Sequence, residues 1–424
     1  MGAVMDKKLL GSWVVHHTNK LQNVSNQNGY DSTFVAGKAG ILLSAISSNG
    51  ERRLSRSKVE ALAKSANINI PFELPKLIDI LCDHELLDQS ESEIATLGVT
   101  TLSILQHTAD IFTGQTPSTK ELAAIQLSEF ASREPILSAG VSEKISDLFK
   151  LDRSNVSQLL YDSENIGFVD VEKISKEDKL FFNGNLFRRD DTAKIRRVLD
   201  SLTVPEQTKL NEFNEILRSK ACVSIEFAKS MLGEQLFQKV SAIGLYDVNV
   251  VSNSTESIGF LTLPSAFSKF SSSIVEDAFD LAKAFISSIT YGITKSSEAR
   301  GQIKMVDALL GALVRGESVG PVPAIGEDYK ILEMKGVVEV SWGSKKGRSG
   351  HMMKLLKKEV GELALQAIRQ GDVSEHSLAC FPTATVTKFQ GPEFNRERIR
   401  KLQVAQSPKD TNDILMALRT GRAY

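Results

Sequence analysis

The sequence predicts a mainly α-helical chain with small β-hairpins, arranged as units in series. One observation is that long stretches carry apolar residues at the spacing of amphipathic helices. A second is a pattern that occurs four times: an apolar helix end, a short turn that often holds glycine, and an apolar strand. When Leu87, Phe168, Leu245 and Val337 are taken as equivalent, the copies are 81, 77 and 92 residues apart. Near-equal spacing favours a true repeat, and a helical chain with a few unrelated hairpins is the alternative.

The fourth copy has a distinctive charge. A short helix is predicted before Gly336, which ends it, and residues 337–342 form a strand rich in β-branched side chains. The segment GSKKGRSG supplies turn residues for the tip of a hairpin, and HMMKLL returns as its second strand. Between Val340 and Lys358 there are six Lys or Arg residues and no Asp or Glu.

The predicted order is helix, glycine turn, strand, basic tip and return strand. A recognition helix and its wing have the same order. This stretch resembles the winged-helix version of the helix-turn-helix. The resemblance is to a large superfamily, and it implies a third helix that lies across two others while a hairpin caps one end. Such a fold does not fix function.

The expected helices follow from apolar periodicity and from the positions of breaking residues. Ser55 or Ser57 is expected to cap the helix over 54–66, and Asn183-Gly184 is expected to turn a hairpin in the second unit. The expected helices cover residues 5–24, 35–48, 54–66, 73–88, 100–112, 122–131, 141–151, 154–168, 192–202, 206–219, 232–243, 274–292, 300–316, 324–336 and 360–371.

Polar breaks between these helices divide the chain into units. The expected division is an N-terminal helix (1–31), winged-helix-like units over 32–116, 117–190, 191–272 and 273–372, the last with the basic wing, and a C-terminal tail (373–424).

Composition is that of an ordinary globular protein, with 42% apolar and 24% charged residues. The net charge is −1, so any nucleic-acid binding depends on local patches. Cys82, Cys222 and Cys380 lie far apart and form no CxxC pair, which predicts a reducing cytoplasm. No run of about 18 apolar residues is present, so no contact with a membrane is expected.

Catalytic motifs are not found. Lys38 follows Gly37, but the phosphate-loop spacing is missing, and no zinc-protease, nucleophile-elbow or dinucleotide motif occurs. Glu333-Met334-Lys335 has the E-x-K spacing of some metal-dependent nucleases, yet it falls on a predicted helix where such a site needs a strand. We therefore predict a protein that is not an enzyme and needs no metal or cofactor.

The predicted function is non-catalytic binding of double-stranded DNA through the basic wing. Flexible glycines, serines and long cationic side chains suit contact with a phosphate backbone, although charge runs are often only solvated surfaces. The wing residues are Lys345, Lys346, Arg348, His351, Lys354, Lys357 and Lys358; secondary basic patches are Arg52, Arg53, Arg56 and Lys58 in the first unit and Arg396, Arg398, Arg400 and Lys401 in the tail.

The alternative is a scaffold or adaptor subunit whose winged-helix units bind partner proteins, such as an ATPase or nuclease. It is favoured by the wings of the first three units, which are acidic or neutral, as in the segment QSESE.

Overall fold

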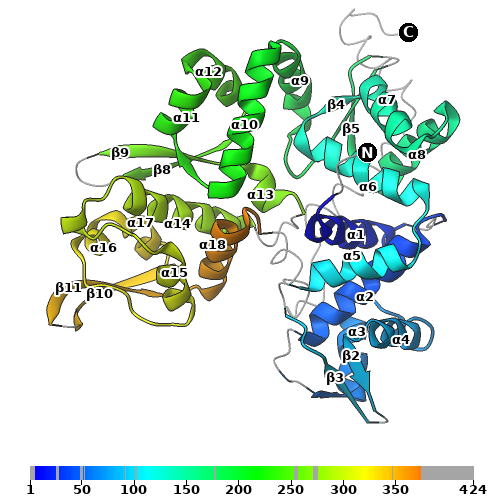
Figure 1. Cartoon of the computed structure of the whole chain (residues 1–424), viewed down its shortest axis with the longest axis horizontal. Helices are drawn as coiled ribbons and strands as arrows, with labels where there is room; N and C mark the ends of the chain where they lie inside the picture. The colour runs from blue at the N-terminus through cyan, green and yellow to red at the C-terminus, as the bar shows by residue number, and fades with distance from the viewer. Residues whose placement is uncertain are drawn as a thin grey trace, which may run out of the picture.

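The computed structural model describes residues 5–24, 28–47, 51, 53–90, 92–100, 103–175, 178–252, 256–270, 276–345 and 347–373. These residues form mainly α-helices, with small antiparallel sheets of two or three strands, as the sequence predicted (Figure 1). Within the same ranges, no helix is both long and apolar enough to cross a membrane.

The first part of the chain is built on three helices that pack closely through glycines. A Cβ placed on Gly37 would lie 1.9 Å from Thr18 Oγ1, and one on Gly40 would lie 2.2 Å from Thr108 Oγ1. The N-terminal helix therefore shares one apolar core with this unit. The elements are α1 (Lys7–Leu21), α2 (Asp31–Ser47), β1 (Arg53–Ser55), α3 (Arg56–Ser65), α4 (Leu74–Asp83), β2 (Leu87–Gln89), β3 (Glu93–Thr96) and α5 (Ile104–Gly114), with sheet order β1-β3-β2.

The second part begins with a well-capped helix. The Ser118 hydroxyl accepts from the backbone of Glu121, whose carboxylate accepts in return from Ser118, so two donors at the helix start are satisfied. The elements are α6 (Thr119–Arg133), β4 (Ile136–Leu137), α7 (Ser138–Phe149), α8 (Arg153–Ile166), β5 (Asp170–Lys173) and β6 (Lys179–Phe182), with sheet order β4-β6-β5.

The third part repeats the same order of elements. Thr203 and Glu206 form a second capping box at the start of its long helix. The elements are η1 (Arg189–Asp191), α9 (Thr192–Asp200), α10 (Val204–Lys220), β7 (Val223–Ser224), α11 (Ile225–Leu232), α12 (Glu234–Ala242), β8 (Asp247–Ser252), β9 (Ser257–Thr262) and α13 (Pro264–Ser268), with sheet order β7-β9-β8.

The fourth part has the same order in a reduced form, because a single bridge between Val319 and Met353 replaces the first strand. Its hairpin is the longest of the four. The elements are α14 (Glu276–Thr294), η2 (Glu298–Arg300), α15 (Val306–Val314), α16 (Pro323–Asp328), α17 (Lys330–Met334), β10 (Val338–Lys345), β11 (Arg348–Leu355) and α18 (Lys358–Gln370).

One helix ending recurs in all four parts, before β2, β5, β8 and β10. Each time a residue with positive φ follows the helix, and the next backbone N–H donates to the carbonyl five residues earlier, which closes the helix. The positive-φ residues are Glu85, Gly167, Gly244 and Gly336, and the donors are Leu86, Phe168, Leu245 and Val337. The equivalent position in the first copy is thus Leu86, one residue before the predicted Leu87.

Several local predictions were wrong. The helix expected over 324–336 is divided at Tyr329 into α16 and α17, and the helix expected over 300–316 begins only at Val306. Asn183-Gly184 follows β6 and does not turn the hairpin, because β5 and β6 are joined through residues 174–178. The helix expected over 232–243 is the end of α11 and all of α12, with Gly233 between them. Ser55 precedes α3 as expected, but its side chain makes no capping hydrogen bond.

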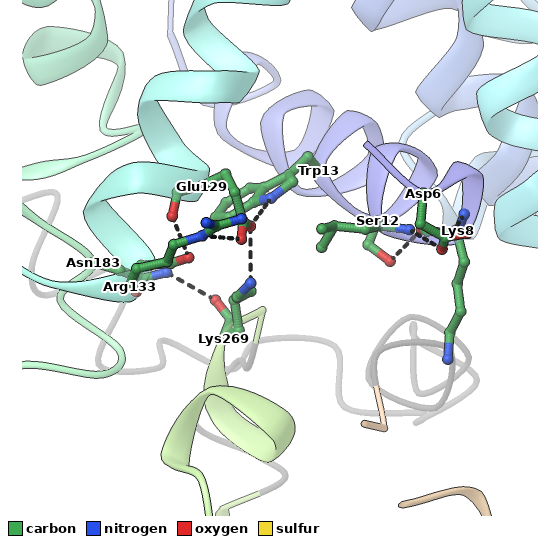
Figure 2. A network of polar contacts seen from close by, with 10 residues as sticks. Asp6, Lys8, Ser12, Trp13, Glu129, Arg133, Asn183 and Lys269 are labelled. Carbon is green, nitrogen blue, oxygen red and sulfur yellow. Dashed lines mark hydrogen bonds and ion pairs between the residues drawn. The ribbon is translucent and has the colours of Figure 1, made fainter. Parts of the chain in front are cut away.

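A buried ion pair joins the first three parts of the chain. Glu129 on α6 accepts from Trp13 Nε1 on α1 and from Lys269 Nζ after α13, each at 2.9 Å. Figure 2 shows these contacts, together with Arg133 Nε at 3.1 Å from Glu129 and the Asn183 amide donating to the Lys269 carbonyl at 3.1 Å. Their convergence on one carboxylate fixes how α1, α6 and the end of α13 meet.

The end of the fourth part contacts the beginning of the chain. Lys8 Nζ on α1 lies 3.0 Å from the carboxylate of Asp372, just after α18. The unit that carries the basic hairpin is thereby connected to the N-terminal helix, while the hairpin itself lies at the outer edge of that unit (Figure 1).

Candidate nucleic-acid interface

The basic hairpin is longer and its turn is tighter than the sequence predicted. Its register runs from Val338 opposite Leu355 to Lys345 opposite Arg348. The eight-residue segment predicted as the tip therefore lies mostly within the two strands, and only Lys346 and Gly347 stand between them. Gly347 has φ of 75°, which glycine adopts without strain. Eight residues at about 3.4 Å each make an arm roughly 25 Å long.

The base of this arm is rooted in the core. Val338 and Met353 are each 1% exposed, and Leu355 is also buried. Val319 and Met353 exchange two backbone hydrogen bonds of 2.9 Å, so the free edge of β11 is partly paired. The base of the arm is therefore fixed relative to the rest of the unit.

Strand geometry divides the arm into two faces, because side chains alternate and directly opposite residues share a face. The first face starts in the core and carries the pairs Val338–Leu355, Val340–Met353, Trp342–His351 and Ser344–Ser349. The second face carries Glu339–Lys354, Ser341–Met352, Gly343–Gly350 and Lys345–Arg348.

The structure brings only some of the predicted wing residues together. Lys345 and Arg348 are exposed and directly opposite each other at the tip, and Lys354 lies lower on the same face. His351 lies on the other face. Lys346 lies outside the described residues.

Lys357 and Lys358 are at the far end of the arm from the tip. They stand where β11 passes into α18, and Lys358 Nζ lies 3.4 Å from Glu362 on the next turn of that helix. They cannot act on one phosphate together with Lys345 and Arg348, because the length of the arm separates them.

The positive charge of the second face is concentrated at the tip. Lys345 Nζ donates to the Ser318 carbonyl at 3.1 Å, which uses one of its three donors and leaves the other two for a ligand. Lys354 is opposite Glu339, so the middle of this face is electrically balanced. The strongest positive charge on this face is therefore the exposed Lys345–Arg348 pair.

Two cations of the secondary patch in the first unit are paired with acids. Arg53 lies 3.7 Å from Glu93 on the neighbouring strand, and Lys58 lies 2.8 Å from Glu51. Arg56 is exposed at the first position of α3. Arg52 and the tail residues Arg396, Arg398, Arg400 and Lys401 lie outside the described residues.

The E-x-K triplet is not arranged as in a nuclease. Glu333 and Met334 end α17, and Lys335 follows in the turn before Gly336. Asp328, the upstream carboxylate, is 3% exposed and accepts from Arg300 at 2.7 Å. Over the described ranges, no group of three or more His, Cys, Asp or Glu side chains is placed to hold a metal ion.

The sequence interpretation missed one residue of this surface. Trp342 is 71% exposed although it continues the apolar row of Val338 and Val340. Its ring meets that of His351 edge to face, with centroids 5.2 Å apart. Alternation along the strand would have put Trp342 on the core face, but only the structure shows that the core ends before it.

No protein-family model matches the chain, and the search of curated proteins gave no match.

Proposed function

We propose that the four parts are winged-helix units and that the protein binds double-stranded DNA, without catalysis, through the hairpin of the fourth. The order helix, short strand, two helices and hairpin supports the first half of this proposal. The proposed DNA binding is supported by the Lys345–Arg348 pair at the tip of a hairpin whose base is buried in the core. No acidic residue lies between Val340 and Lys358 to oppose a phosphate there.

Contact with phosphates determines how the proposed binding depends on salt and on DNA sequence. Cations that neutralise DNA phosphates release condensed counterions, so binding weakens as salt rises. Such contacts position a protein on the duplex but carry no base sequence. The proposed binding is therefore salt-dependent and largely independent of sequence.

The test is duplex binding by the whole protein at several salt concentrations. Changing Lys345, Lys346 and Arg348 together to Ala should weaken binding to every duplex. It should also lower the slope of log affinity against log salt by about two to three, since each phosphate that is no longer neutralised accounts for roughly 0.9. The matched control changes Arg53, Arg56 and Lys58 to Ala, which removes the same charge from a patch in which Arg53 and Lys58 already lie near acids. Equal weakening in the two variants would contradict the assignment to the hairpin.

A scaffold role is the second candidate, and an exposed edge strand favours it. β8 lies at the edge of its sheet, and its Val248 and Val250 are 53% and 62% exposed. An edge of this kind accepts a strand from another protein. If Val250→Lys removes a co-purifying subunit while the hairpin triple variant binds DNA as the parent does, the scaffold role is the correct one.

We place the protein in the cytoplasm. The support is that Cys82 and Cys222, the cysteines in the described residues, are free thiols, as is usual for proteins of a reducing compartment.

A further inference from the structure

The hairpin has an aromatic face as well as a basic one. We propose that Trp342 stacks on an unpaired base, so that the protein prefers duplex ends or junctions with a single-stranded segment over continuous duplex. This inference rests on the proposed DNA binding and names the form of DNA that the same site takes.

The position of Trp342 is unusual for so large an apolar side chain. The chain has two tryptophans, and the other, Trp13, is fully buried with its indole N–H donating to Glu129. Trp342 instead lies beyond the point where the apolar row leaves the core, between half-buried Val340 and exposed Ser344. Its indole is available to a ligand in the conformation described.

The ring is supported from one side. His351 meets it edge to face and is itself packed against α16, since a Cβ on Gly326 would lie 2.5 Å from His351 Cδ2. His351 is therefore in close contact with α16 as well as with the ring of Trp342. An aromatic ring that is already oriented loses less conformational entropy when a flat partner stacks on it.

The two faces fit two parts of one ligand. Lys345 and Arg348 attract a phosphate backbone on the second face, and Trp342 presents an aromatic surface on the first. Every base has a π-face, so stacking tolerates any sequence, as phosphate contact does. Such a hairpin suits the end of a duplex. The phosphate backbone would lie against the cationic face, and an unpaired base would lie against the indole on the other face.

Continuous duplex would leave the indole unused, because its bases are already stacked and their exposure requires unstacking. The expected preference for a single-stranded extension thus comes from Trp342, whereas the affinity common to all DNA comes from Lys345 and Arg348. This separation makes the inference testable apart from the proposed function.

The test measures dissociation constants for a blunt duplex and for the same duplex with a single-stranded extension, at one salt concentration. Trp342→Ala should weaken binding to the extended duplex by about 5- to 150-fold, the range of one stacked base. Binding to the blunt duplex should stay within about twofold. Trp342→Phe should restore part of the preference, because it keeps a ring. Thermal unfolding of both variants checks that the hairpin still folds.

Fluorescence gives a second measure that does not depend on affinity. The emission that disappears in Trp342→Phe reports on this residue, since Trp13 is common to both proteins. That component should be quenched by the extended duplex and not by the blunt one.

Three outcomes distinguish failure of the proposed function from failure of the stacking inference. If the parent protein binds neither DNA, the proposed function has failed and the stacking inference with it. If binding depends on Lys345 and Arg348 but Trp342→Ala weakens both DNAs equally or neither, only the stacking inference is wrong. If Trp342→Ala leaves DNA binding intact and removes a protein subunit, the indole is a protein contact.

Discussion

The Lys269 ammonium lies 2.9 Å from the Glu129 carboxylate in a pair whose side chains are only 13% and 5% exposed. The two residues are far apart in the chain, and both also contact Trp13, Lys269 through a cation–π approach of 5.7 Å. A buried pair is costly to break, because the remaining charge keeps its desolvation penalty and loses its partner.

We therefore expect Lys269→Met to destabilise the protein by about 3–5 kcal/mol. The measurement is the urea concentration at the midpoint of the unfolding transition that includes α1 and α6. Lys179→Met is the matched control, because Lys179 forms an ion pair with Glu164 at 2.7 Å but both side chains are about one-third exposed. Screening by water should limit that destabilisation to about 1 kcal/mol. Similar destabilisation by the two variants would show that burial of the Glu129–Lys269 pair does not raise the cost of breaking it.

Stability should also respond to acid through Glu129. Burial alone would raise the pKa of its carboxyl, but Lys269, Trp13 and Arg133 together lower the pKa below its ordinary value of 4.5. A carboxyl with a lowered folded-state pKa contributes stability above its unfolded-state pKa and loses it as pH falls through the folded-state value. The stability difference between the parent and Glu129→Gln should be constant well above pH 4.5 and should shrink below it. A difference that grows on acidification would contradict the lowered pKa.

The close packing of α1 against α2 leads to a third prediction. Gly37→Ala improves helix propensity by about 1 kcal/mol, yet the new Cβ would lie 1.9 Å from Thr18 Oγ1 and 2.6 Å from its Cβ. Steric conflict should exceed that gain, with a net destabilisation of roughly 1–3 kcal/mol. Gly311→Ala on α15 is the control, since the nearest atom there is the end of the flexible Arg315 side chain at 3.3 Å. It should be neutral or stabilising in the same thermal unfolding assay.

Much of the fold was predictable because it depends on local signals. Gly167, Gly244 and Gly336 mark helix ends where positive φ is needed, and amphipathic spacing gave the class of the fold. The strands β4 and β7 were missed because two residues are too few to show alternation, and each exists through pairing with a strand more than 30 residues later. Asn183-Gly184 was misassigned because Asn183 instead holds the Lys269 carbonyl from another part of the chain.

The candidate site was predictable in its charge and not in its geometry. The run of cations around Lys345 is visible in the sequence. Its division between two faces depends on the register, which placed Lys354 opposite Glu339 and Trp342 opposite His351. A shift by one residue would exchange the faces, and the sequence of the predicted tip, rich in glycine and serine, did not fix that register.

Glu339 provides the last prediction, because it is an acidic residue on the cationic face. It lies directly opposite Lys354, where it offsets that charge and repels an approaching phosphate. Glu339→Gln should tighten binding to all duplexes by a few fold at low salt. It should also steepen the slope of log affinity against log salt by up to about 0.9, as Lys354 becomes available for one more phosphate. Glu143→Gln, at an exposed position of α7 in the second unit, is the control for a change in net charge alone. If both variants tighten binding equally, the effect belongs to the charge of the whole molecule and the second face of the hairpin is not where DNA lies.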